Sequence, residues 1–383
     1  MSDEPNRIRS FVEVWVRRVL TISGCVLIWI VLLAAFPLWL IAAAIIDLAR
    51  GSVAQAARIG DSVVHADRLP TGHCVAHGAG SRAGHARKWI ITRCALFFPF
   101  YFSCEVFGIV ASFVIWLASG VWAGASRERF LDWNFGLQRW WANALCLSAQ
   151  RIFGIRIEVE GADELCDGPV IVFLRHASIA DTLLPAVFIA NPNGLKLRYV
   201  LKHELLLDPC LDIVGNRLPN SFVRRNSGEG YRVIELMRNL GPRDGVIIYP
   251  EGTRFTDAKR EVMIEQLERK GETYLCEKAR KLKNVLPPRL GGPLNLLDRN
   301  EAADVVFCAH FGFDGVVDLR DFLRGSLVGR LVKVRFWRIP FASIPTTRDG
   351  RKDWLFENWM RVDEWVGIQK ANEPLATLRL GGS

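Results

Sequence analysis

PVIVFLRHASIADTLLPAVF, residues 169–188, is the stretch around which the fold of this chain is organised. The apolar run 169–174 predicts a buried strand, and residues 182–188 predict a helix. Between them, His176 and Asp181 are five positions apart at the strand-to-helix turn. An aspartate there can hold one imidazole nitrogen as a donor, which leaves the other nitrogen free to take a proton from a hydroxyl group. The pattern therefore indicates a general base with an orienting acid.

A second interpretation fits the same residues. Ser178 precedes Asp181 by three positions, which is the spacing of a capping box at the start of a helix. In that case Asp181 only caps the helix and His176 is a loop residue. Acid–base pairs and helix caps both occur at helix starts, so the rest of the chain has to decide between them.

The part of the chain after residue 154 has the pattern of an α/β protein. Residues 156–160 alternate between polar and apolar side chains, and Gly161 ends the run. Residues 228–239 predict a helix that ends before Gly241-Pro242. Further strands are expected at 169–174, 197–201, 246–249, 305–311 and 331–339. We therefore expect a mixed sheet flanked by helices.

Two long hydrophobic stretches precede this region, at residues 19–46 and 95–122. A membrane span needs roughly twenty apolar residues, so the first stretch can cross a bilayer or bend at Pro37 into a shallow re-entrant hairpin. Glu105 interrupts the second stretch, and an acid at that depth needs a partner or an interfacial position. We expect an N-terminal region that inserts into the membrane.

The expected domain organisation follows from these patterns. The membrane region is assigned to residues 1–125, including a polar connector between its two stretches. Residues 126–153 mix tryptophan with charged residues, which fits an interfacial helix or a helix packed on the soluble domain. The catalytic domain is assigned to residues 154–370 and a tail to residues 371–383.

The composition of the chain limits the classes of molecule that it is expected to bind. The formal net charge of +9 fits an anionic partner such as an anionic membrane surface or a phosphorylated substrate. Nucleic acid is not expected, because the arginines are not interleaved with exposed aromatic residues. The nine cysteines form no CxxC pair, which indicates reduced thiols. His73, Cys74 and His77 match no strong zinc pattern, so no metal is predicted.

Three further segments carry reactive or basic residues. The apolar strand 246–249 leads into Pro250-Glu251-Gly252-Thr253-Arg254, where Gly252 lets backbone N–H groups approach an anion and Arg254 offers a fork for phosphate. The other two are Phe222-Val223-Arg224-Arg225 and the run 284–292, which contains Pro288. Taken singly, these segments fit a surface turn, a solvated basic patch and a loop.

The order of the four segments changes their interpretation. His-x4-Asp, Phe-Val-x-Arg, Glu-Gly-Thr-Arg and a segment ending in Pro-Pro-Arg follow one another along the chain. This combination resembles the glycerolipid acyltransferase family, in particular the 1-acylglycerol-3-phosphate acyltransferases. The resemblance runs from about residue 150 to about residue 366, and the tail from Arg338 to Asp363 is similar to the branch that acylates lysophospholipids.

The resemblance implies a mechanism and a set of roles. His176 would be the general base and Asp181 its orienting acid, with no acyl-enzyme, and the chain lacks a Gly-x-Ser-x-Gly elbow. The oxyanion donors would be backbone N–H groups near Asp181 or Gly252. The substrate-binding residues implied are Phe222, Arg224, Arg225, Glu251, Gly252, Thr253, Arg254 and Pro288, with Arg225 and Arg254 on the acceptor phosphate. No cofactor is implied beyond acyl-CoA or acyl carrier protein as co-substrate.

The chain departs from the family pattern at two positions. Arg175 stands before the histidine where the family often has Asn, and Pro219 stands six residues before Arg225 where the family usually has Gly. The second departure leaves open whether Arg224 or Arg225 meets the substrate, and the Phe-Val-x-Arg spacing favours Arg225.

The expected reaction is transfer of a fatty acyl group from a thioester to the free hydroxyl of 1-acylglycerol-3-phosphate, which gives phosphatidic acid. The expected partners are this lysophospholipid, the acyl donor and the bilayer, with the catalytic domain on the cytoplasmic face of the membrane. Two alternatives stay open: an acyltransferase for another lysophospholipid or a lyso-aminolipid, and a non-catalytic membrane protein of the same fold. Intact His176, Asp181, Glu251 and Arg254 argue against the last alternative.

Overall fold

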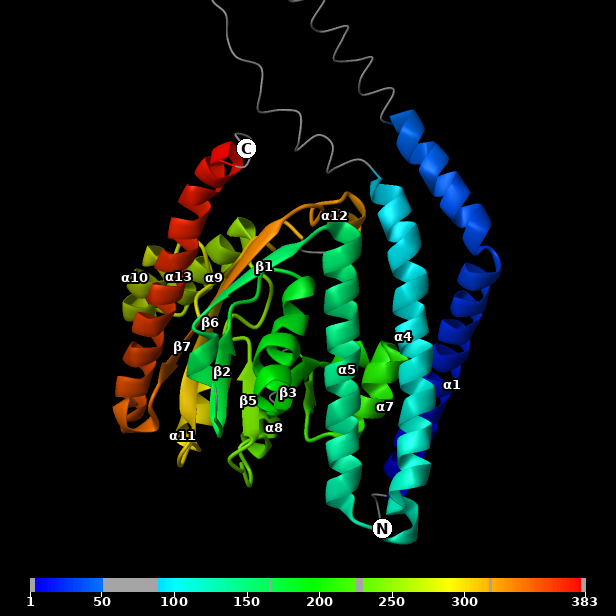
Figure 1. Ribbon diagram of the computed structural model, residues 1–383. Helices are drawn as coiled ribbons and strands as arrows, with labels where there is room; N and C mark the ends of the chain where they lie inside the picture. Colours follow the sequence, from blue (N-terminus) through cyan, green and yellow to red (C-terminus); the bar gives the residue numbers. More distant parts are fainter. Residues whose placement is uncertain (1–3, 51–88, 166, 225–229, 317–318, 380–383) are drawn as a thin grey trace, which may run out of the picture.

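A seven-stranded sheet forms the centre of the protein, with strands in the order β1-β7-β6-β2-β5-β3-β4 (Figure 1). The computed structural model describes residues 4–50, 89–165, 167–224, 230–316 and 319–379. The strands are β1 (Arg156–Glu160), β2 (Val170–Leu174), β3 (Lys196–Lys202), β4 (Ser221–Val223), β5 (Asp244–Ile248), β6 (Asp304–Phe311) and β7 (Leu331–Ile339). The mixed α/β sheet expected from the sequence is confirmed, and the short strand β4 was not predicted.

The pairing of the strands determines where the site lies. β2 pairs in parallel with β5 and β6, and β3 pairs in parallel with β5 and β4. β7 runs antiparallel to β6, and β1 follows β7 in parallel at the edge. The carboxyl ends of β2, β3, β4, β5 and β6 therefore meet at one edge of the sheet, where α/β proteins place their sites.

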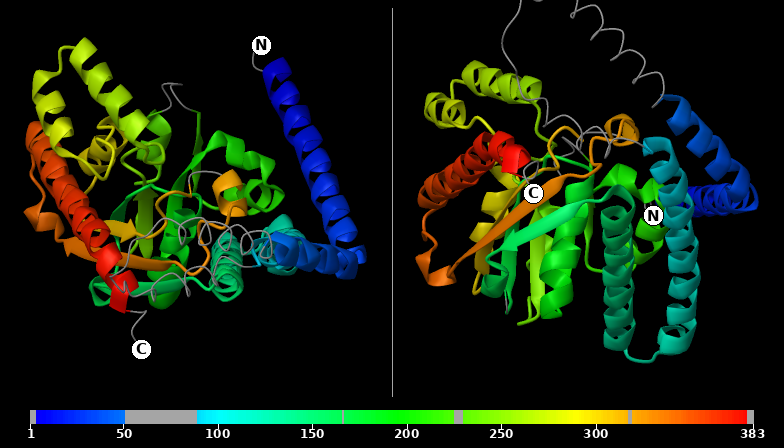
Figure 2. Two further views of the ribbon diagram at one scale, coloured as in Figure 1. Left: turned by 90° about the horizontal axis from the view of Figure 1, so that it is seen from above. Right: turned by 45° about the horizontal axis from the view of Figure 1, so that its top comes forward.

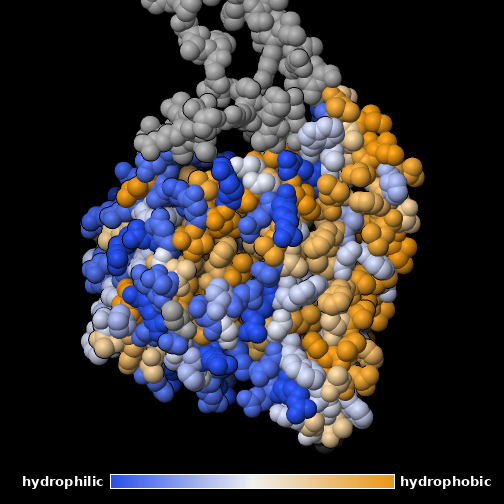
Figure 3. Space-filling model, viewed as in Figure 1, coloured by the Kyte–Doolittle hydropathy of each residue, from blue (hydrophilic) through white to orange (hydrophobic). Residues whose placement is uncertain are grey.

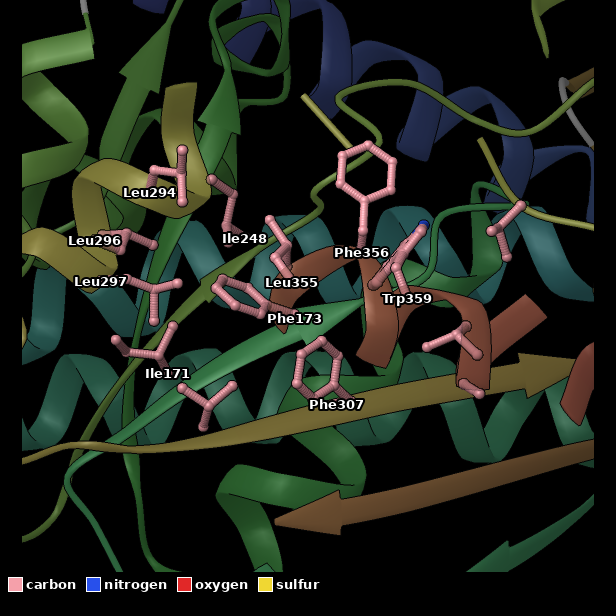
Figure 4. Close-up of a cluster of buried hydrophobic side chains, with 14 of the residues drawn as sticks. Ile171, Phe173, Ile248, Leu294, Leu296, Leu297, Phe307, Leu355, Phe356 and Trp359 are labelled. Atoms are coloured by element: carbon pink, nitrogen blue, oxygen red, sulfur yellow. The ribbon is translucent and has the colours of Figure 1, made fainter. Parts of the chain in front are cut away.

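Apolar residues of the central strands pack under helices on one face of the sheet (Figure 4). These helices are α8 (Gly230–Glu235), α11 (Gly291–Asp298) and α13 (Arg348–Arg379). Phe307 lies between Phe173 and the tryptophans of β7 and α13, with ring centroids 5.5 Å from Phe173 and 6.4 Å from Trp359. β2 is buried at all five positions, which explains its continuous apolar sequence.

The other face is covered by the segment after β2 and by α5 (Arg127–Phe153). The sequence predicts one helix over 182–188, but the structure has a 3-10 helix, η3 (Ala180–Leu183), followed by a π-helix, η4 (Pro185–Ala190). Pro185 has no backbone N–H to donate, and its ring crowds the carbonyl group four residues earlier, which disfavours one continuous α-helix through this position. α5 packs against α4 and η4 while Trp133 and Trp140 stay exposed.

The remaining elements connect these layers. The predicted helix 228–239 is seen only as α8, and residues 225–229 lie outside the described part of the chain. The other helices are α6 (Asn191–Asn193), α7 (Pro209–Arg217), α9 (Asp257–Arg269), α10 (Thr273–Lys281), α12 (Leu319–Leu323) and the 3-10 helices η1 (Val121–Ala123), η2 (Ala162–Leu165), η5 (His203–Leu207) and η6 (Phe341–Ser343). α9 and α10 project beside the carboxyl edge of the sheet (Figure 2).

The N-terminal region is helical and apolar on its surface. α1 (Glu4–Ala34) ends at a turn at residue 35, before Pro37, and a second helix covers residues 36–50. α4 (Ile90–Ser119) contains the second hydrophobic stretch. Among the described residues, two helical segments are long and apolar enough to cross a membrane, Val12–Ala34 and Ile90–Ala123. Apolar side chains cover the side of the molecule formed by α1 and α4 (Figure 3).

Apolar packing of α4 on α5 and α7, together with polar contacts and one close approach, holds these helices to the sheet domain. Arg17 and Arg18 of α1 pair with Asp212 of α7, at 3.0 and 3.1 Å. Glu105 of α4 accepts a hydrogen bond from the indole of Trp141 in α5, at 2.8 Å, so the buried acid has the partner that its position requires. At Gly108 of α4, an added Cβ would lie 2.6 Å from a sulfur atom of α7.

Candidate active site

The predicted dyad is formed at the carboxyl end of β2. His176 Nδ1 lies 3.0 Å from Asp181 Oδ1, and the other carboxylate oxygen accepts hydrogen bonds of 2.7 Å from the backbone N–H groups of Ala177 and Ser178. Both interpretations of this turn therefore apply, because Asp181 caps the turn and orients His176 at the same time. A carboxylate can only accept, so His176 carries its proton on Nδ1 and keeps Nε2 free.

Asp181 stays ionised although it is completely buried. Burial alone would raise its pKa, but the charge and hydrogen bond of His176, together with His310, outweigh this and hold the pKa of Asp181 well below its usual range. The carboxylate is thus a permanent acceptor for the imidazole. This is the electrostatic condition for a base that must become a cation when it takes a proton.

His310 of β6 and Arg175 of β2 bind each other behind the dyad. His310 Nε2 lies 2.9 Å from the Arg175 carbonyl oxygen, and the Arg175 guanidinium donates to the His310 carbonyl oxygen at 2.8 Å. Arg175 is 1% exposed and also pairs with Asp314 and donates to the carbonyl oxygen of Asn284. Arg175 therefore links β2, β6 and the loop before residue 286 from a buried position.

Glu251 joins three segments at the same edge. Its carboxylate accepts from the backbone N–H of His176 at 3.1 Å and from that of Leu286 at 3.4 Å. Burial raises the pKa of Glu251 to about 8, against the charge of Arg175 and the two N–H groups. Glu251 is completely buried, so it shapes the site from behind and does not face the substrate.

An apolar cavity of about 320 Å³ opens beside His176. Its wall combines residues from the ends of β3, β4 and β5 with residues of α5, η3 and η5. His176 lies on this wall together with Tyr249, Gly252, Val223 and Trp141. The ring of Tyr249 lies against the imidazole, with centroids 4.5 Å apart. The nitrogen that can accept a proton is thus next to a space suited to a hydrocarbon chain.

Gly252 and Arg289 form the basic rim near the cavity. Gly252 has a φ of 64°, which favours glycine, and an added Cβ would lie 2.8 Å from the flexible Arg289 side chain, which would have to move. Arg289 is exposed, whereas the predicted binding residue Pro288 is buried. In this motif it is therefore the arginine, not the proline, that reaches the surface beside Gly252.

The other predicted substrate-binding residues differ in how they lie relative to the site. Phe222 is buried against α7, where its ring would meet a Cβ at Gly215. Arg224 is exposed, and its guanidinium lies 3.3 Å from the imidazole of His203. Thr253 and Arg254 are half-buried in the turn after β5, and Arg225 lies outside the described residues. The structure therefore leaves Arg225 a prediction.

The backbone N–H groups expected to stabilise an oxyanion are already engaged. Those of Ala177 and Ser178 bind Asp181, that of Ala180 binds the Ser178 hydroxyl, and that of Gly252 binds the Tyr249 carbonyl oxygen. A group that already has an acceptor is not a preorganised oxyanion donor. These four N–H groups are therefore not oxyanion donors in this arrangement, and the expectation of donors near Asp181 or Gly252 stays a prediction.

α13 braces the loop that closes the site. The Trp359 indole donates to the Leu286 carbonyl oxygen at 2.9 Å, and the Asp363 carboxylate accepts from the backbone N–H groups of Lys283 and Val285 at 2.8 and 3.1 Å. The loop is thus held from one side by α13 and from the other by Glu251.

Two residues of this site were not identified from the sequence. His310 is inside a buried apolar strand, where a single histidine gives no periodic signal. Tyr249 precedes the Pro-Glu-Gly turn, and its position at the end of a strand was the available signal. Both become visible only when β2, β5 and β6 are placed side by side.

Comparison with known proteins identifies a family and a solved structure to which the chain is similar. Residues 156–286 match the family model described as Acyltransferase. No curated protein matches the chain in sequence. The chain is similar to the crystal structure of the 1-acyl-sn-glycerophosphate (LPA) acyltransferase, PlsC, from Thermotoga maritima, with 16% sequence identity and a TM-score of 0.44. That match covers 70% of this chain and 98% of the other.

Proposed function

We propose that the chain is an acyltransferase, as the match of residues 156–286 to the Acyltransferase model supports, and that it acylates the free hydroxyl of a lysophospholipid, with 1-acylglycerol-3-phosphate as the acceptor. The acyl donor is a thioester of coenzyme A or acyl carrier protein, and no further cofactor takes part. The product of this reaction is phosphatidic acid.

One observation supports this proposal most strongly. His176 shares its Nδ1 proton with the buried carboxylate of Asp181 while its ring lines an apolar cavity. A base in this position can activate a hydroxyl group that is attached to a hydrocarbon-rich molecule. The chain provides no Gly-x-Ser-x-Gly nucleophile, so direct transfer from donor to acceptor is the simpler route.

The proposed reaction has two steps. Nε2 of His176 takes the proton of the acceptor hydroxyl as its oxygen attacks the thioester carbonyl carbon, which gives a tetrahedral oxyanion and an imidazolium paired with Asp181. The intermediate then collapses, the carbon–sulfur bond breaks, and the imidazolium returns its proton to the leaving thiolate. The products are an ester and a free thiol, and His176 is neutral again.

The surroundings of the cavity suit the two substrates. An acyl chain fits the apolar wall formed by α5, η3 and η5. Arg254 and Arg289 flank the turn at Gly252, and guanidinium groups there would hold the phosphate of the acceptor. Arg225 would share this role. The apolar surface of α1 and α4 would place the site at a bilayer, where both lipids reside.

The decisive experiment compares wild type with His176→Ala in nanodiscs, using labelled acyl-CoA or acyl carrier protein thioester. The acceptors are lysophosphatidate, a lysophospholipid with a larger headgroup, a lyso-aminolipid and monoacylglycerol. We expect wild type to prefer lysophosphatidate. The alanine protein should turn over on the order of 10²- to 10⁴-fold more slowly with unchanged nanodisc binding, because only the proton acceptor has been removed.

The panel also separates the alternatives. Equal rates with lysophosphatidate and monoacylglycerol would contradict phosphate recognition, and a preference for a larger headgroup would move the assignment to lysophospholipid remodelling. Full turnover by the His176→Ala protein would eliminate the general-base role. If no acceptor is acylated by wild type, the chain is a non-catalytic member of the family.

A further inference from the structure

We propose that His310 is a positioning residue that holds Asp181 in register with His176, so that the site works as a His–Asp–His arrangement and not as an isolated dyad. This inference rests on the proposed function for its kinetic consequences. Its structural part, the contact between His310 and Asp181, stands independently.

The position of His310 relative to Asp181 is the first argument. His310 Nε2 lies 3.4 Å from Asp181 Oδ2, and both side chains are 0% exposed. Oδ2 is also the oxygen that accepts from the N–H groups of Ala177 and Ser178. All three N–H groups therefore gather on one side of the carboxylate. The remaining oxygen, Oδ1, is left to His176.

The tautomer of His310 follows from its second contact. Nε2 lies 2.9 Å from the Arg175 carbonyl oxygen, which can only accept a hydrogen bond. Nε2 must therefore carry the proton, and it directs that proton between the Arg175 carbonyl and Asp181. In the neutral ring Nδ1 then has no proton, and it is a buried atom without a hydrogen-bond partner among the described residues.

The ring cannot move away from this position easily. The Arg175 guanidinium donates to the His310 carbonyl oxygen and pairs with Asp314, so the backbone of β6 is fixed to the end of β2 at the same point. Phe313 packs edge-on against the His310 ring, with centroids 5.8 Å apart. Because the His310 ring is already fixed by these contacts, its N–H group does not have to reorient when His176 takes up a proton.

The contact has a predictable electrostatic consequence. Each N–H group that binds Asp181 disperses its negative charge, so removing His310 should leave more charge on Oδ1 and make His176 a stronger base. The other ionisable groups around this cluster are Arg175, Asp314 and Cys308 near His310, and Glu251 and Tyr249 near His176. All of them stay in place in a variant that changes only residue 310.

The test compares His310→Leu, which removes the donor, with His310→Gln, whose amide nitrogen can occupy the place of Nε2. Both variants are assayed in nanodiscs across pH with saturating acyl donor. For the leucine variant we expect kcat to fall on the order of 10- to 100-fold, because a misplaced base loses its alignment. The acid limb of its kcat/KM profile should move to higher pH, whereas the glutamine variant should resemble wild type.

A thermal melt of each variant shows whether it is folded. If the folded leucine and glutamine variants both have the wild-type rate and pH profile, the proposal is wrong. If both lose activity equally without a shift of the acid limb, His310 is only a packing residue and the proposal is also wrong.

A second measurement does not depend on activity or on the leucine variant folding. In ¹⁵N-histidine NMR spectra, the resonances missing from His310→Gln identify His310 in wild type. We expect the pattern of an Nε2-protonated neutral ring, and a change of this pattern in Asp181→Asn. An unchanged His310 signal in Asp181→Asn would overturn the contact. A wild type that acylates nothing would instead refute the proposed function and leave this result intact.

Discussion

At the carboxyl edge of the sheet, Asp181, Glu251 and Arg175 are fully or almost fully buried, and each has two or more hydrogen-bond partners. The N-terminal helices are different, because α1 and α4 expose long apolar faces. α1 is tied to α7 by polar pairs such as Arg17–Asp212, whereas α4 also packs its apolar residues against α5 and α7. Polar and charged groups in this buried edge need partners, because an unpaired buried group is costly. A surface that lipid can cover needs only enough polar contacts to set its orientation.

The largest effect is expected from Asp181→Asn, which changes a buried charge at the carboxyl edge of the sheet. The amide keeps the shape of the carboxylate but removes its charge and can present a donor to His176, which favours the wrong tautomer. We expect kcat to fall on the order of 10²- to 10⁴-fold while nanodisc binding is unchanged. The measurement is single-turnover acyl transfer, and a loss below tenfold would show that the orientation of the imidazole does not depend on this charge.

Arg175→Leu tests the buried arginine behind the dyad. It leaves Asp314 and the carbonyl oxygens of His310 and Asn284 without their partner, so the free energy of unfolding should fall by about 3–5 kcal/mol. Denaturant unfolding in detergent measures this. The matched control is Arg335→Leu, whose pair with Glu160 is 3.9 Å long and half exposed, and which should cost only about 0–1 kcal/mol. Equal costs would remove the distinction between the buried edge and the surface.

The sequence predicted the edge of the sheet better than its interior. Ordered motifs located His176, Asp181, Glu251 and Gly252, because the turns after β2 and β5 have distinctive local residues. It did not predict the role of His310, since that residue reaches the dyad only through the pairing of β2 with β6. The break of the helix at Pro185 was readable in principle, because proline lacks the N–H that a continuous helix needs.

In the N-terminal region, the sequence predicted the helices but not the contacts that attach them. Hydrophobicity alone located both long helices, and the segment 51–88 that joins them, with its His73, Cys74 and His77, lies outside the described residues. The contacts that attach the helices to the sheet domain were not predicted. Asp212 carries no motif, and its pairing with Arg17 and Arg18 depends on a separation of more than 190 positions along the chain.

Asp212→Asn tests the attachment of α1. The amide loses the charge that holds Arg17 and Arg18, so the free energy of unfolding should fall by about 1–3 kcal/mol. Turnover of acceptors in the bilayer should fall more than turnover of a short-chain acceptor in solution, because the chemistry is untouched. Asp132→Asn, which breaks a more exposed pair with Lys196, is the control and should change both rates little. Equal loss with both acceptors would contradict an orienting role.

The smallest expected effect concerns Glu251 and pH. Its pKa in the folded protein is raised from 4.5 to about 8, so the folded state binds a proton that the unfolded state has released between these values. The stabilisation from this group is therefore complete below about pH 4.5 and is lost as pH rises through about 8. In Glu251→Gln this dependence should disappear. Melting temperatures at pH 6 and pH 9 measure it, and identical slopes in both proteins would refute the expected pKa.

The order of the strands in the sheet also affects how the chain folds during its synthesis. β2, at the centre of the sheet, pairs with β5 and β6 and not with any strand that precedes it. During synthesis its apolar residues therefore wait unpaired until residue 248 has left the ribosome, and the contact with His310 waits longer still. Long-range parallel pairing of this kind slows folding and exposes strand edges. A nascent chain that stalls between Asp181 and Asp244 should therefore be an aggregation-prone substrate for chaperones, with the His176–Asp181 motif already made but without a sheet to hold it.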